Sequence, residues 1–186
     1  MFQKPKEYYH VLGEFMTKFS SMETSLVSYC SIIKYLCNYQ EGFDEFSPLS
    51  ISDRLKYISK FIKESLPELQ NDWNKIVQKI NEVNENRRHL IHGIGRASFY
   101  TESITTHVPK KGKTVSKDFS IEDINKIIDN IEHICTGDNG IQGEFHNNFC
   151  ISRYDYHNER IDASNKIVYR LNGVAVTKFK GEANTN

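Results

Sequence analysis

Two arginines and two histidines lie within the six residues from Arg87 to His92. They end a run in which apolar residues recur at helical spacing, namely Trp73, Ile76, Val77, Ile80 and Val83. These side chains suit phosphate chemistry, because arginine makes forked contacts to phosphate oxygens and histidine exchanges a proton near neutral pH. We therefore take this segment as the strongest candidate for a reactive site.

Helical geometry predicts where these side chains point. At about 100° per residue, Arg87 comes close to the middle of the apolar stripe. Asn84, Arg88 and His92 follow one another at four-residue steps along one edge of that stripe, so Arg88 and His92 can contact the same group. An inward-facing guanidinium requires a carboxylate or an anionic ligand. Gly93 is typical of a helix end, and the helix dipole there favours protonated His92.

The segment Arg87-Arg88-His89-Leu90-Ile91-His92-Gly93 resembles the motif of the HEPN superfamily, the small all-α domains of many prokaryotic toxins, abortive-infection proteins and RNA-cleaving effectors. That motif is an arginine, usually a polar residue, three variable positions and a histidine, often followed by glycine. Arg87 matches the family arginine and His92 the family histidine. Arg88 stands where asparagine, aspartate or histidine is usual. The resemblance covers about residues 6–136.

The resemblance implies a metal-independent endoribonuclease that cleaves single-stranded RNA by 2′-hydroxyl attack, without a cofactor. His92 would be the acid and base, and Arg87 and Arg88 would hold the phosphate. Family members usually build the cleft from two motifs, so we expect a homodimer. We also expect a cytoplasmic toxin or anti-phage defence effector, with an antitoxin or another defence-system protein as a partner. Asn84 is a supporting residue.

Glu23 and Arg87 leave structural alternatives open. Related domains often carry an acidic residue in the first helix that faces the motif arginine, and Glu23 matches it. Glu23 is otherwise a solvated helix-edge charge. Arg87 could also serve only to pair with Glu23, and His92 only to close its helix. A second functional hypothesis is a non-catalytic HEPN-like module that binds a nucleotide, RNA or a protein. The balance of 24 basic and 24 acidic residues favours it, as does Arg88 at the polar position.

The predicted fold is mainly α, an HEPN-like four-helix bundle. We expect helices over residues 6–39, over residues 51–65 with Ser50 or Ser52 as the cap, from Pro67 to His92, and from Ser120 onward. Residues 40–49 are predicted to form a loop. We expect the first and third helices to form an antiparallel pair, and the fourth to pack on the third. Residues 1–137 would be the helical domain.

The remaining segments are predicted to be β-structure. A small insertion at about 94–119 contains two short strands, a basic turn and a segment that pairs back. Lys110, Lys111 and Lys113 in this turn are candidates for RNA binding, although basic hairpin tips also occur on ordinary surfaces. Residues 138–186 are expected to form a β-rich appendage of the same domain, strand-like over 145–156 and ending in a hairpin around Asn172-Gly173.

Several other chemistries lack their motifs. The sequence contains no glycine-rich phosphate loop, no Gly-x-Ser-x-Gly elbow and no His-Glu-x-x-His pair, and we expect no metal site. The four cysteines form no Cys-x-x-Cys pair, so we expect them to be reduced, intracellular and mostly packed. No apolar run is long enough to span a membrane, and the first residues lack the apolar core of a signal peptide.

Overall fold

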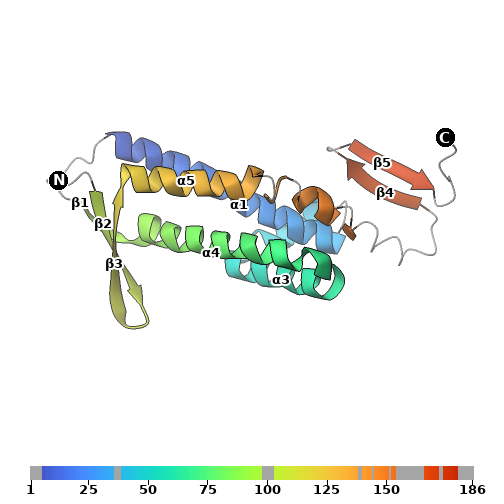
Figure 1. Ribbon diagram of the computed structural model, residues 1–186, viewed down its shortest axis with the longest axis horizontal. Coiled ribbons are helices and arrows are strands. Elements are labelled where there is room, and N and C mark those ends of the chain that lie inside the picture. The colour runs from blue at the N-terminus through green and yellow to red at the C-terminus, as the bar shows by residue number, and fades with distance from the viewer. Residues whose placement is uncertain are drawn as a thin grey trace.

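The computed structural model describes residues 6–35, 39–97, 103–137, 140–143, 145–150, 152–153, 166–171 and 174–179. The protein is mainly helical, with two small antiparallel sheets (Figure 1). The helices are α1 (Lys6–Tyr35), α2 (Tyr39–Phe46), α3 (Ile51–Ser65), α4 (Gln70–His92) and α5 (Ile121–Thr136), with a 3-10 turn at Pro67–Leu69. The strands are β1 (Ile94–Ala97), β2 (Ser103–Lys110), β3 (Lys113–Ser120), β4 (Lys166–Leu171) and β5 (Val174–Phe179).

Four helices enclose the core. α1 and α4 each pack against α5 and α3, so they face each other across the core (Figure 1). The rings of Tyr29 in α1 and Trp73 in α4 lie 6.2 Å apart. The expected packing of α5 on α4 is confirmed, but the expected pairing of α1 with α4 as immediate neighbours is wrong. Apolar periodicity shows which face of a helix is buried, and it does not show which helix covers that face.

The predicted caps of α3 and α5 and the predicted end of α4 are confirmed. Ser50 caps α3 by accepting a hydrogen bond from the backbone N–H of Asp53. Ser120 and Asp123 form a reciprocal capping box at the start of α5. α4 ends at His92, where the backbone N–H of Gly93 donates to the carbonyl of His89. Among the described residues, we find no helix with the length and apolar character that a bilayer crossing needs.

The loop predicted over residues 40–49 is wrong, because most of it forms the short helix α2. This helix packs against the end of α1, where Gly42 approaches Ser31 closely. Lys34 of α1 also pairs with Glu45 of α2 at 2.6 Å. Glycine and aspartate often mark loops, but here glycine permits a close helix-to-helix approach that the local pattern does not reveal.

Replacing Gly42 by alanine should destabilise the fold by about 1–3 kcal/mol. A Cβ at this position would lie 2.3 Å from the Cβ and 2.8 Å from the Cα of Ser31, so the helix itself has to move. Gly13 offers a matched control, because a Cβ there meets nothing within 4 Å. Gly13→Ala should stabilise α1 by about 0.5–1 kcal/mol. Urea unfolding of both variants measures the difference, and equal midpoints would contradict the tight approach.

The predicted β insertion is confirmed. β2 lies between β1 and β3, and all neighbouring strands run antiparallel. Lys111 and Gly112 form the two-residue turn between β2 and β3, with φ values of 50° and 77°. Ile104 and Val108 of β2 and Phe119 of β3 are buried, whereas the other residues of β3 up to Asp118 are exposed. The sheet thus covers one end of the bundle and its hairpin projects beyond it (Figure 1).

The expected strand over residues 145–156 is wrong in its described part, because residues 145–150 are helical. Phe145 and Phe149 are spaced by one helical turn, and both pack on Tyr29. The Tyr29 hydroxyl also donates to the carbonyl of Ile141 at 2.9 Å. Ile141, Phe145 and Phe149 therefore belong to the hydrophobic core of the bundle. β4 and β5 pair as expected, and their connecting Asn172-Gly173 lies outside the described residues.

Candidate functional site

The motif residues lie on the last two turns of α4, where this helix meets the three-stranded sheet and approaches α1. The prediction that Arg87 points inward is confirmed. Its guanidinium carbon lies 4.9 Å from the ring centre of Phe19 in α1. Its Nε is buried and has no hydrogen-bond partner among the described residues. The aromatic ring stabilises the cation but accepts no conventional hydrogen bond from it, so this donor stays unsatisfied.

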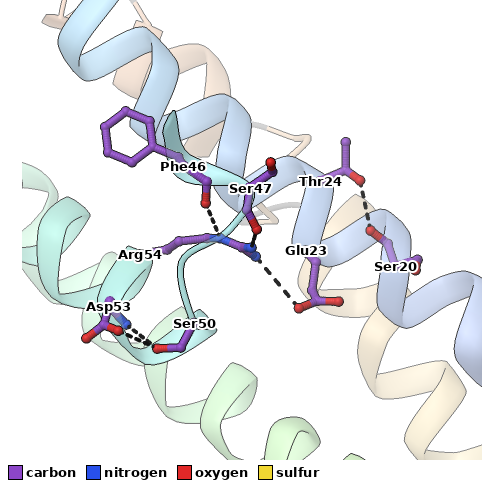
Figure 2. A network of polar contacts seen from close by, with 8 residues as sticks. All are labelled: Ser20, Glu23, Thr24, Phe46, Ser47, Ser50, Asp53 and Arg54. Atoms are coloured by element: carbon purple, nitrogen blue, oxygen red, sulfur yellow. Dashed lines mark hydrogen bonds and ion pairs between the residues drawn. The ribbon is translucent and has the colours of Figure 1, made fainter. Parts of the chain in front are cut away.

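The expected contact between Glu23 and Arg87 is wrong. Glu23 Oε1 lies 3.7 Å from Nη1 of Arg54 in α3. Arg54 is 5% exposed and also donates to the carbonyls of Phe46, at 3.0 Å, and Ser47, at 2.6 Å (Figure 2). A buried guanidinium requires such partners, and α3 begins beside the middle of α1, where Glu23 is available.

Arg88 holds the hairpin against α4. Its Nη2 donates to the carbonyl of Pro109 at 2.6 Å. One turn earlier, Glu85 pairs with Lys110 at 2.7 Å, and this contact lowers the pKa of the Glu85 carboxyl. Lys111 and Lys113 are exposed at the turn. Of the three lysines predicted to bind RNA, Lys110 is therefore paired with Glu85, and Lys111 and Lys113 are exposed to solvent.

His89 occupies a variable position of the motif, for which the motif implies no role. It is 3% exposed, and its Nδ1 lies 3.1 Å from the hydroxyl of Thr106 in β2. That hydroxyl donates its hydrogen to the carbonyl of Lys117, so it must accept from His89. Nδ1 therefore carries the proton in neutral His89. Burial lowers the pKa of His89. The alternation of Ile104, Thr106 and Val108 in β2 indicates that Thr106 faces inward, but it does not indicate that His89 is its partner.

Asn84 and His92 differ in burial. Asn84 is half-buried, as is Arg88, whereas His92 is exposed. Arg88 and His92 project only about 40° apart, but Arg87 and His92 diverge by about 140° around the helix axis. Helical geometry therefore places Arg88 and His92 on one side of α4. It does not direct Arg87 and His92 of one chain to the same point.

The described cysteines are free thiols with raised pKa values. Burial raises the pKa of Cys30 to about 12, and the pKa values of Cys135 and Cys150 to about 11. Such thiols are poor nucleophiles near neutral pH. Cys37 lies outside the described residues. Within the described ranges, His, Cys, Asp and Glu form no group of three or more with the arrangement of a metal site.

A pocket of about 250 Å³ lies between α4 and α5, away from the motif. Its polar lining consists of Asp72, Lys75, Lys79 and His133. Lys75 already pairs with Asp72 at 2.9 Å, so only Lys79 and His133 are left to face a ligand. No sequence pattern marks this set, because its members come from two helices that are distant in sequence.

Comparison with known proteins does not assign this chain to a family. No family model matches the chain, and neither a curated protein nor a solved structure is significantly similar to it. The likeness to the HEPN superfamily therefore rests on the motif from Arg87 to Gly93 and on its position at the end of a long helix.

Proposed function

We propose that this protein is a metal-independent endoribonuclease with an HEPN-like four-helix bundle. The observation that carries the proposal is the environment of Arg87. Arg87 is half-buried and has no acidic partner in the described part of the chain, while Glu23 is engaged by Arg54. An arginine in this state suits an anionic ligand such as the phosphate of RNA.

The proposed reaction is an attack of the ribose 2′-oxygen on the adjacent phosphorus. A base removes the 2′-hydroxyl proton, the new P–O bond forms, and the bond to the 5′-oxygen breaks. An acid protonates the departing oxygen, which leaves a 2′,3′-cyclic phosphate and a 5′-hydroxyl. His92 is exposed and would transfer these protons. Arg87 and Arg88 would stabilise the charge that accumulates on the phosphate.

A homodimer is part of this proposal. Arg87 and His92 diverge by about 140° on α4, so one chain does not present both to one phosphate. Two copies that meet along the ends of α4 would place His92 of one copy near Arg87 of the other. Lys111 and Lys113 would extend the cationic surface for the RNA backbone. In the cell the protein would act as a toxin or anti-phage effector, with an antitoxin or another defence protein as its partner.

A non-catalytic binding module is the second candidate, and the contact of Arg88 favours it. Its Nη2 already donates to the carbonyl of Pro109, so the side chain has a structural role that holds the hairpin in place. In this alternative, Arg87 and the lysines of the hairpin would bind RNA, a nucleotide or a protein without cleaving it.

Cleavage of single-stranded RNA in EDTA tests the two candidates. The ribonuclease should produce fragments with a 2′,3′-cyclic phosphate, and light scattering should give the mass of a dimer. RNA that binds but stays intact at equimolar protein would support the binding module. Intact RNA without any binding would contradict the ribonuclease and would restrict the ligand of the binding module to a nucleotide or a protein.

A further inference from the structure

α3 covers only part of the line along which α1 and α4 face each other. Trp73 of α4 donates to Ser59 of α3 at 2.8 Å, and the two helices are joined by a short turn. Antiparallel helices rise by the same 1.5 Å per residue, so Ile51, the first residue of α3, lies about level with Asn81. The later turns of α4 therefore extend beyond α3 (Figure 1). α1 likewise extends beyond the contact of Glu23 with Arg54.

The uncovered stretch has a defined set of side chains. Met16 and Leu12 precede Glu23 by seven and eleven residues, so they lie on the side of α1 that faces α3. Ile91 follows Trp73 by five complete turns and also points to that side. All three apolar side chains are half-buried. We call this strip the α1–α4 seam, with Leu12, Met16 and Ile91 at its edges and Phe19 and Arg87 beneath them.

The chemistry of the seam is that of an incomplete helix contact. In the neighbouring covered stretch, α3 supplies Arg54, and α1 supplies the carboxylate of Glu23. Beyond α3, the α1–α4 seam itself carries the positive charge, which is the guanidinium of Arg87. The Nε of this residue is buried and unsatisfied within the described chain. A helix that combines apolar side chains with a carboxylate therefore fits the seam, because it covers the apolar edges and pairs with Arg87.

We infer that the α1–α4 seam binds an amphipathic helix of a partner protein, which continues the path of α3 and places a glutamate or aspartate against Arg87. The stretch of α4 that extends beyond α3 contains the 11 residues 82–92. At 1.5 Å per residue it is about 16 Å long, so a helix of about three turns spans it. Such a helix would occlude the arginine of the proposed ribonuclease. This inhibitory consequence rests on the proposed function, whereas the docking does not.

A pair of synthetic peptides tests the docking. The first is a fluorescein-labelled 16-residue helix with leucines on one face and a single glutamate at the centre of that face. The second has glutamine in place of the glutamate. In fluorescence anisotropy with EDTA and without RNA, the native protein should bind the glutamate peptide about tenfold more tightly, because a hydrogen bond to a charged group is a strong one.

Three variants assign this preference to the seam. Arg87→Gln should reduce the difference between the peptides to less than twofold, and Met16→Asp should weaken the binding of both. Lys79→Gln removes a cation from the α5 side of the same helix and should change neither affinity. Melting curves establish that each variant is folded. If Arg87→Gln does not fold, Arg87→Lys serves instead, and it should reduce the preference at least threefold.

Three results would overturn the inference. The first is that the two peptides bind the native protein with equal affinity. The second is that the folded Arg87 variant keeps the full preference for the glutamate peptide. The third is that the peptide is released as the protein self-associates, which would assign the seam to a second copy. RNA cleavage is measured separately. If the peptide binds in a way that depends on Arg87 but RNA is not cleaved, the proposed ribonuclease activity is wrong and the docking site stands. If RNA is cleaved but the peptide does not bind, the docking site is wrong and the ribonuclease activity stands.

Discussion

Replacing His92 by alanine should reduce the cleavage of single-stranded RNA by at least about 100-fold, since general acid–base groups typically contribute 10²–10⁴. The melting temperature should stay within about 2 °C of the native value, because a surface substitution usually changes stability by less than about 0.5 kcal/mol. His92 is exposed at the last position of α4, and the backbone bond that closes the helix involves His89 and Gly93. Initial rates in EDTA and a thermal melt measure the two effects.

His133 provides the matched control for this experiment. It is an exposed histidine in the last turn of α5, and it lies outside the motif. His133→Ala should leave the cleavage rate unchanged. Undiminished cleavage in His92→Ala would identify the activity as that of a contaminating nuclease. An equal loss in both variants would show that the assay reports a general effect on the fold.

Replacing Arg87 by alanine should also lower RNA cleavage by at least about 100-fold, because the transition state loses a forked cationic contact. The fold should keep its stability within about 1 kcal/mol. The substitution removes a cation–π contact, which is worth about 0.5–1 kcal/mol at a partly exposed site. It also removes a buried donor without a partner in the described chain, which offsets that loss. Thermal melts and cleavage rates on the same preparation give both quantities.

Arg54 shows how a structural arginine would behave in the same measurements. It is buried, bonds two carbonyl groups and pairs with Glu23 (Figure 2). Arg54→Ala should destabilise the fold by about 3–5 kcal/mol, and its residual cleavage should follow the folded fraction. If Arg87→Ala melts many degrees lower and follows the same proportionality, then Arg87 is structural. The main support for the ribonuclease is lost in that case.

Local signals in the sequence were sufficient for several elements. The apolar period of Trp73, Ile76 and Ile80 predicted α4 and the inward direction of Arg87, because side-chain directions in a helix depend only on the residue count. The caps at Ser50 and Ser120 were also predictable, since each bond joins residues three positions apart. The alternation and the basic turn likewise predicted the β2–β3 hairpin.

Contacts between distant segments were decided only by the tertiary structure. The partner of Glu23 depends on where α3 begins beside α1, and a carboxylate in that position pairs with whichever cation is brought within reach. The helical state of residues 145–150 depends on the burial of Phe145 and Phe149 against Tyr29. α2 depends on the absence of a Cβ at Gly42. Helical period and caps act within a few residues, so the sequence by itself determined that Arg87 points into the core. Which side chains surround it there depends on how whole helices pack, and only the assembled bundle decides that.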